Sequence, residues 1–355
     1  MSNEIPAEVK NHLNLRGIEF TEFSSEDPKA LHDLFLAFGF SRIMRHTSKN
    51  IDLYRQGNIT YLINFEPQSF GTKFYKDHGP CVSSMGWKVD DTSFAHTEAL
   101  ERGGKDGTEA ADYSLEGKQI QSIYGIGDSL IYFIDNHKDE DRYEKMGFAK
   151  LDNPDMVEDL GFEFVDHLTN NVQYGTMEKW SNFYKDIFGF YEVRYFDIKG
   201  AKTGLTSFAL RSPDGSFCIP INEAKDKKSQ INEYLEEYKG AGVQHIAFHT
   251  SDIIKSVAGL QKSGITCLDI DDEYYAEVFE RVPNVSEDHK RLKDLQILVD
   301  GDEGGYLLQI FTKNIIGPIF IEIIQRKNHL SFGEGNFGAL FRSIERDQQK
   351  RGYLD

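Results

Sequence analysis

The chain has 355 residues, a formal net charge of −18 and 39% hydrophobic residues, which is typical of a globular protein long enough for two ordinary domains. Its acidity argues against a nucleic-acid-binding surface, which needs clustered Lys and Arg side chains to offset phosphate charge. No apolar run approaches the roughly 18 residues of a membrane span, and the first residues lack the basic start and apolar stretch of a signal peptide. We therefore expect a cytoplasmic protein that binds neither nucleic acid nor membrane.

The first 135 residues predict a strand, a helix and then several more strands. Apolar residues recur at helical spacing from Leu31 to Phe38, and Gly39 ends this helix. The other elements predicted here are a hairpin that turns at residues 57–58, strands near 81–89 and 129–135, and a helix over 93–102. Charged residues crowd the stretch 136–160, as in a solvated linker. The three cysteines are scattered and predict neither a disulfide framework nor a zinc site.

The second half of the chain repeats this order of elements. Four segments match: GIEFTEF from Gly17 with GFEFVDH from Gly161, LHDLFLAFGF from Leu31 with WSNFYKDIFGF from Trp180, CVSSMGW from Cys81 with GVQHIAF from Gly242, and GDSLIYF from Gly127 with GPIFIEI from Gly317. Four matches in the same order indicate two copies of one module. This alignment sets Phe23, Ser84 and Tyr132 of the first copy against His167, His245 and Glu322 of the second.

Glu322 is unusual because apolar residues surround it in GPIFIEIIQRK, residues 317–327. The pattern predicts a strand covered on both faces, where a carboxylate needs either a salt bridge, the commoner partner of a buried acid, or a metal ion. The alignment with His167 and His245 favours the metal, since two imidazoles and one carboxylate hold one face of an octahedral ion and leave three positions open. Non-haem Fe(II) oxygenases use this set, but zinc hydrolases use the same residue types, so the three residues do not name the metal. His249 lies about 13 Å from His245 along the same predicted strand, too far to share the ion.

Several motifs around these residues resemble the 4-hydroxyphenylpyruvate dioxygenase family. They are DHLTNNV at Asp166, GVQHIAF at Gly242, FIEIIQR at Phe320 and FGEGNFGALFRSIERDQ at Phe332. The resemblance covers nearly the whole chain and implies an α+β vicinal oxygen chelate fold, in which βαβββ repeats form two tandem open barrels followed by a C-terminal helix. It implies an N-terminal barrel without metal at 10–135, a linker at 136–160, a catalytic barrel at 161–330, and a C-terminal gating helix and tail at 331–355.

The resemblance also implies an activity and a cofactor. His167, His245 and Glu322 fall on the family's ligands to Fe(II). The implied reaction converts 4-hydroxyphenylpyruvate and O2 to homogentisate and CO2 by oxidative decarboxylation, ring hydroxylation and side-chain migration, a step of tyrosine and phenylalanine catabolism. The substrate supplies its own 2-keto acid, so we expect no requirement for 2-oxoglutarate. A homo-oligomer, either dimer or tetramer, is expected as well.

Ten more residues match family positions around the substrate. The catalytic polar positions are Ser207, Asn222, Gln230 and Gln309, and the remaining pocket positions are Gln244, Pro220, Phe311, Phe332, Phe337 and Leu340. Neutral hydrogen-bonding side chains suit a phenol and a carboxylate that are held without being titrated. Regular pleating, however, points Gln244 away from the face that carries His245.

A C-terminal helix is predicted after Gly335. Its apolar face is formed by Phe337, Leu340, Phe341 and Ile344. Asn336 is the predicted N-cap. Gly333 and Gly335 precede the helix as candidate hinges, so this helix is a candidate gate over the metal site.

Two other functions are compatible with these residues. Hydroxymandelate synthase resembles this family, uses the same substrate and metal, and hydroxylates the benzylic carbon instead of the ring. The pair Pro220 and Asn222 together with Phe337 follows the ring-hydroxylating pattern. A non-catalytic small-molecule-binding protein of the same fold would not need the three ligands, which the first copy lacks.

Overall fold

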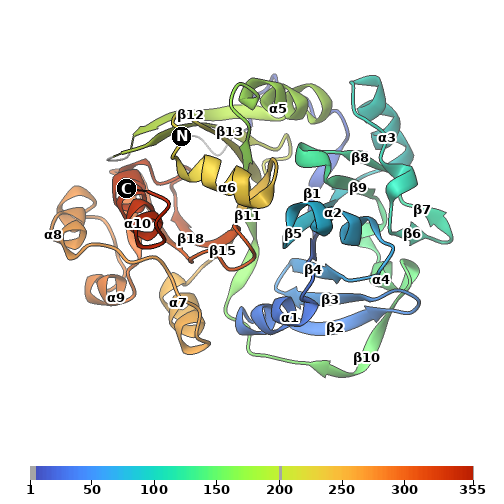
Figure 1. Ribbon diagram of the computed structural model, residues 1–355, viewed down its shortest axis with the longest axis horizontal. Helices are drawn as coiled ribbons and strands as arrows, with labels where there is room; N and C mark the ends of the chain where they lie inside the picture. Colours follow the sequence, from blue (N-terminus) through green and yellow to red (C-terminus); the bar gives the residue numbers. More distant parts are fainter. Residues whose placement is uncertain (1–4, 200–201, 355) are drawn as a thin grey trace.

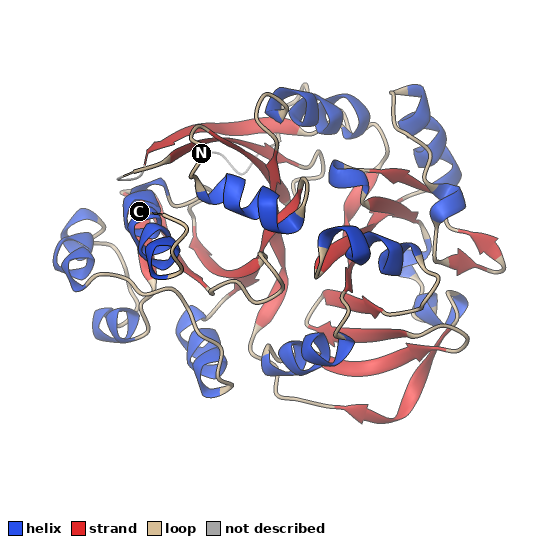
Figure 2. Cartoon of the chain, in the orientation of Figure 1, coloured by secondary structure: helices blue, strands red, loops and turns tan. Residues whose placement is uncertain are grey.

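The protein folds into two β-rich modules that lie side by side (Figure 1). The structure is a computed structural model and describes residues 5–199 and 202–354. Each module is built on one eight-stranded sheet, and helices cover the outer faces of the sheets (Figure 2).

The first module has the strand order β10-β2-β3-β4-β1-β5-β9-β8. Its strands are β1 (Leu15–Ser24), β2 (Ser41–His46), β3 (Ile51–Gln56), β4 (Ile59–Asn64), β5 (Cys81–Val89), β8 (Ser122–Tyr124), β9 (Leu130–Ile134) and β10 (Phe148–Asp155). Its helices are α1 (Pro28–Ala37), α2 (Phe70–His78), α3 (Thr92–Glu101) and α4 (Arg142–Lys145), and a small separate hairpin consists of β6 (Ser114–Leu115) and β7 (Lys118–Gln119).

The second module has the strand order β12-β13-β14-β11-β15-β18-β17-β16. Its strands are β11 (Phe162–Val172), β12 (Tyr191–Lys199), β13 (Gly204–Arg211), β14 (Cys218–Ala224), β15 (Gly242–Thr250), β16 (Leu298–Asp302), β17 (Gly305–Phe311) and β18 (Phe320–Lys327). Its helices are α5 (Met177–Phe183), α6 (Gln230–Tyr238), α7 (Ile253–Lys262), α8 (Asp272–Arg281), α9 (His289–Asp294) and the C-terminal α10 (Phe337–Lys350).

The two sheets share one topology. In each, the first strand of the module pairs in parallel with the fourth, β1 with β4 and β11 with β14, and antiparallel with the fifth. The fifth strand then pairs in parallel with a later one, β5 with β9 and β15 with β18. The second sheet curves into a half-barrel with α6 and α10 at its open side (Figure 2). The predicted α+β fold of two tandem repeats and a C-terminal helix is therefore confirmed.

The register of the sheets corrects one part of the repeat alignment. His167 lies opposite Ala247, which lies opposite Glu322. In the first sheet Phe20 lies opposite Gly86, which lies opposite Tyr132. The equivalent of His167 is thus Phe20, and the predicted match with Phe23 is wrong by three residues. Both β1 and β11 contain register shifts, which a comparison of the letters does not show.

The segment 136–160 is more than the predicted linker. It contains α4 and the edge strand β10, which pairs antiparallel with β2. Three apolar residues within its charged sequence, Tyr143, Met146 and Phe148, are buried in the core of the first module. Because these residues are isolated among charges, the sequence shows no apolar run that would predict a strand.

Aromatic side chains join the two modules. The ring of Trp87 lies 4.7 Å from that of Phe188 and 5.3 Å from that of Phe217. On the other side, the rings of Phe40 and Phe248 are 5.7 Å apart. These contacts belong to one apolar cluster that spans both modules, so the modules pack as one body. No helix among the described residues is both long enough and apolar enough to cross a membrane.

Candidate metal centre

Three neighbouring strands bring His167, His245 and Glu322 together. His167 comes from β11, His245 from β15 and Glu322 from β18. The Nε2 atom of His167 is 3.0 Å from Oε2 of Glu322 and 3.3 Å from Nε2 of His245, and the latter is 3.5 Å from Oε2 of Glu322. Glu322 and His167 are buried, and His245 is nearly so. The structure therefore gathers the three residues that the sequence grouped.

The triangle of these atoms has the size that a divalent ion requires. Ligand atoms about 2.1 Å from an octahedral ion are about 3.0 Å apart when they occupy adjacent positions. The three measured sides, 3.0, 3.3 and 3.5 Å, are close to that value. Two nitrogen atoms and one oxygen atom suit iron or zinc better than calcium or magnesium, which prefer oxygen ligands. The residues present fit a transition metal held on one face.

Both imidazoles are oriented by a bond on the far side of the ring. The Nδ1 atom of His167 lies 2.8 Å from Oδ1 of Asp166, and Nδ1 of His245 lies 3.0 Å from Oε1 of Gln244. Each oxygen accepts the Nδ1 proton, which leaves a lone pair on Nε2, directed at the centre of the triangle. This is the tautomer that a metal ligand needs.

A buried ion pair holds Asp166 in place. The Nε and Nη2 atoms of Arg326 each donate to the carboxylate of Asp166 at 2.8 Å. Burial opposes the charge of Asp166, but Arg326 holds the pKa of this carboxyl well below its usual range. Arg326 lies four residues after Glu322 on β18, so the strand that carries one ligand also orients another.

The electrostatics of the triangle favour a cation. Burial raises the pKa of Glu322, but the neighbouring imidazoles outweigh it and hold the pKa at about 2. Burial lowers the pKa of His167, while the charges of Glu322 and Asp166 raise it to about 9. The two carboxylates thus stabilise positive charge beside His167, and a divalent ion would supply that charge without a proton.

A cavity of about 90 Å³ opens from the triangle. It is lined by all ten residues predicted around the substrate: Ser207, Pro220, Asn222, Gln230, Gln244, Gln309, Phe311, Phe332, Phe337 and Leu340. His249 lies outside this cavity and pairs with Glu163, 3.1 Å from Nδ1 to Oε2.

Amide side chains connect the cavity wall to the metal ligands. Gln244 accepts from His245, and its Oε1 also accepts a bond of 3.3 Å from Nδ2 of Asn222. Gln244 therefore lies on the same side as His245, contrary to the prediction from regular pleating. The buried Oε1 of Gln309 has no hydrogen-bond partner among the described residues, and it is available to a ligand in the cavity.

Two aromatic residues of the cavity, Phe320 and Phe196, were not predicted from the sequence. The Phe320 ring stacks on the His245 imidazole at 4.7 Å. Phe196 contacts the rings of Phe332 and Phe337 at 6.0 and 5.3 Å. Phe320 was recognisable from its place two residues before Glu322, whereas Phe196, on the edge strand β12, gave no signal.

The C-terminal helix α10 closes the cavity and is held from three sides. Glu345 accepts a bond of 3.1 Å from the Thr203 backbone amide, Arg346 pairs with Asp271 at 2.9 Å, and Gln348 donates to Glu233 at 2.8 Å. Asn336 occupies the predicted N-cap position of α10, but its side chain makes no capping bond, because its Oδ1 accepts from the Tyr274 hydroxyl at 2.6 Å.

Gly333 matters for the approach to this helix. It has a φ of +79°, and a Cβ at this position would lie 2.4 Å from Oε1 of Gln309. Only glycine fits both the left-handed backbone and the close contact. The turn before α10 is thus built against the amide of the cavity.

Comparisons with known proteins agree with this arrangement. Residues 9–150 match the family model described as hydroxyphenylpyruvate dioxygenase, N-terminal, and residues 164–309 match the glyoxalase/bleomycin resistance protein/dioxygenase superfamily. The chain is 58% identical to protein MelA of Shewanella colwelliana, over 98% of this chain and 100% of that protein. It is 44% identical to a 4-hydroxyphenylpyruvate dioxygenase of Legionella pneumophila, over 97% of this chain and 98% of that protein. A mutant of 4-hydroxymandelate synthase from Streptomyces coelicolor has a similar fold, with a TM-score of 0.81 at 23% identity, over 94% of this chain and 99% of that chain.

Proposed function

The chain belongs to the 4-hydroxyphenylpyruvate dioxygenase family, and we propose that it converts 4-hydroxyphenylpyruvate and O2 to homogentisate and CO2. In this proposal His167, His245 and Glu322 hold Fe(II). Held by these three residues, the ion would supply charge stabilisation and redox chemistry for the reaction of a 2-keto acid with O2. The triangle of two imidazoles and one carboxylate, facing a cavity lined by neutral amides, is the observation that carries the proposal.

The cavity wall suits the two ends of this substrate. Asn222 and Gln244 lie next to His245, and Gln309 has a free buried oxygen. We assign these amides, with Ser207 and Gln230, to hydrogen bonds with the phenol and the keto acid, because a neutral amide binds both without titrating.

The aromatic wall and α10 account for the rest of the pocket. The rings of Phe332 and Phe337 flank the cavity, and Phe311 and Leu340 complete its apolar surface. In our proposal α10 excludes water from the metal and moves to admit substrate. This assigns catalysis to the barrel at 161–330 and gating to residues 331–355. The barrel at 10–135 has no metal role, and we expect the chain to act as a homo-oligomer.

The product distinguishes this proposal from its nearest alternative. A hydroxymandelate synthase would use the same substrate and the same three ligands. The experiment is to load the protein with Fe(II) anaerobically, add 4-hydroxyphenylpyruvate and O2, and identify the product by chromatography and mass spectrometry. Homogentisate is the expected product. Formation of 4-hydroxymandelate selects the alternative, and the absence of O2 uptake rejects both.

A further inference from the structure

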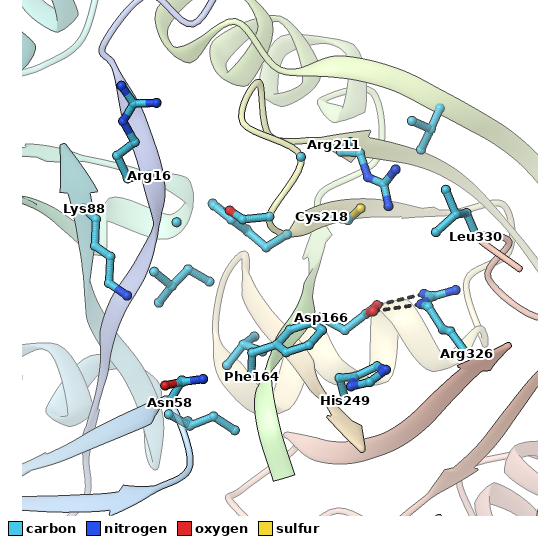
Figure 3. A pocket seen from close by; sticks show the side chains of 18 of the residues that line it. Arg16, Asn58, Lys88, Phe164, Asp166, Arg211, Cys218, His249, Arg326 and Leu330 are labelled. Atoms are coloured by element: carbon cyan, nitrogen blue, oxygen red, sulfur yellow. Dashed lines mark hydrogen bonds and ion pairs between the residues drawn. The ribbon is translucent and has the colours of Figure 1, made fainter. Parts of the chain in front are cut away.

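A second and larger cavity lies between the two modules. It has a volume of about 760 Å³, and residues of both modules line it. Cavities of about 300 to 1,000 Å³ at domain interfaces are the usual setting of small-molecule sites. Figure 3 shows this inter-module cleft, with Arg16 and Lys88 of the first module facing Arg211, Cys218 and Arg326 of the second.

Basic side chains converge on the cleft although the protein as a whole is acidic. All but one of them have an acidic partner: Arg16 pairs with Asp90, Lys88 with Glu19, Arg326 with Asp166 and His249 with Glu163. These acidic partners largely neutralise the four side chains, which leaves them little charge for pairing with a ligand.

Arg211 is the exception among the basic residues of the cleft. It forms no ion pair with the described residues, its Nε atom is buried without a hydrogen-bond partner, and in the sheet it lies opposite Tyr191 on one side and Cys218 on the other. A phenol and a thiol bring no negative charge near neutral pH, so neither neighbour offsets the guanidinium. A guanidinium that lines an open cleft without a counter-charge can pair with a carboxylate or another small anion.

An exposed aromatic platform lies in the same cleft. The Phe164 side chain is 40% exposed, and its ring lies flat on the His249 imidazole, with centroids 4.5 Å apart and planes 10° from parallel. The His249 imidazole covers one face of the Phe164 ring, and the exposed part of the ring lines the cleft (Figure 3). Stacking of a second ring on such a platform contributes about 0.5–1.5 kcal/mol beyond burial.

The cleft is distinct from the metal cavity. The two share Phe332 alone, whose ring lies 5.6 Å from that of His167 and 5.8 Å from the guanidinium carbon of Arg326. A ligand in the cleft would therefore reach the outer side of the Asp166–Arg326 pair, without access to the metal ligands themselves.

From these observations we propose that the inter-module cleft is a second binding site, which takes a small aromatic carboxylate. The carboxylate pairs with Arg211, and the ring stacks against Phe164. This site is independent of the proposed reaction, since none of its polar contacts is a metal ligand.

Calorimetric titration of the metal-free protein with 4-hydroxyphenylacetate tests the proposal. This probe has the required ring and carboxylate but lacks the 2-keto group that chelation of a metal would need. We expect one binding site, weakened at least tenfold in Arg211→Gln and in Phe164→Ala. Phe164 is partly exposed, so its removal leaves the core intact. Arg16→Gln is the matched control. Because the Arg16 guanidinium already pairs with Asp90, its removal should leave binding as in the wild type.

A second comparison assigns the binding to one of the two cavities. Asn222→Ala changes the metal cavity and should leave the affinity for 4-hydroxyphenylacetate unchanged. Cyclohexylacetate, which has the charge without the aromatic ring, should bind at least fivefold more weakly. The proposal is overturned if no binding is seen, or if Asn222→Ala abolishes binding while Arg211→Gln leaves it unchanged.

Discussion

Replacement of Asp166 by Asn tests how far the pair with Arg326 supports the metal centre. Asparagine keeps an oxygen that can accept the Nδ1 proton of His167. It loses the negative charge that pairs with Arg326 through two hydrogen bonds of 2.8 Å. Loss of a partner that orients a metal-bound histidine weakens metal binding about 10- to 100-fold, which corresponds to about 1.4 to 2.7 kcal/mol. The variant also leaves a buried guanidinium without counter-charge, so unfolding should become easier by as much as about 3–5 kcal/mol.

The assay separates these two effects with a matched variant. Asp52 of the first module is also a largely buried acid, and it pairs with Arg42 and Arg45, which are more exposed than Arg326. Asp52→Asn should also lose stability in urea unfolding, by less than Asp166→Asn because its arginines are more exposed, and keep the wild-type Fe(II) affinity, measured anaerobically against a chromophoric chelator. Wild-type affinity in Asp166→Asn would refute the orienting role. An equal loss of affinity in Asp52→Asn would show that the effect comes from general destabilisation.

Three further predictions concern other parts of the chain. His245→Ala should lose Fe(II) in the same chelator assay, whereas Ser84→Ala, its equivalent in the first module, should leave Fe(II) binding unchanged. Burial and the nearby carboxylate of Asp112 raise the pKa of Glu22 from 4.5 to about 7. The folded protein thus holds a proton that the unfolded chain releases, and stability falls as the pH rises from about 4.5 to above 7. Glu22→Gln removes this loss, so its melting temperature relative to wild type should be higher at pH 8.5 than at pH 5; the same difference at both pH values would contradict the assignment. Gly333→Ala should lower kcat/KM with Fe(II) binding retained, because its Cβ displaces the Gln309 amide, at a cost of about 1 kcal/mol or more in stability; unchanged kinetics would show that the amide has room to move.

The sequence predicted the ligand triangle because each ligand breaks a local pattern. Glu322 interrupts a run of apolar residues, and two histidines occur at repeat-equivalent strands. The repeat itself was recovered in the correct order, but the first strand was misaligned because the matching letters Gly-x-Glu-Phe, at 17–20 and 161–164, occupy positions of β1 and β11 that are not equivalent in the sheets. Phe20 and Phe23 are both phenylalanines, so the misalignment did not change the chemical contrast with His167.

Other features of the site depend on contacts that no local pattern carries. Asp166 and Arg326 are 160 positions apart and meet only because β11 and β18 flank β15. The strand β10 comes from a segment whose charges conceal its buried apolar residues. The inter-module cleft requires the relative placement of both modules, which neither module encodes alone.

The strand β18 links the three functional regions of the second module. Glu322 faces the metal position, and Arg326, four residues later, lines the inter-module cleft and holds Asp166. Phe332 follows after a short turn, separates the two cavities and leads into α10. A shift of β18 along its axis would therefore change the ligand triangle, the cleft and the approach to α10 together. Its pairing with β15 on one side and β17 on the other opposes such a shift, because slipping one residue would turn every side chain to the opposite face. The proposed gating by α10 must accordingly arise after Phe332, at the left-handed Gly333, and leave β18 in place.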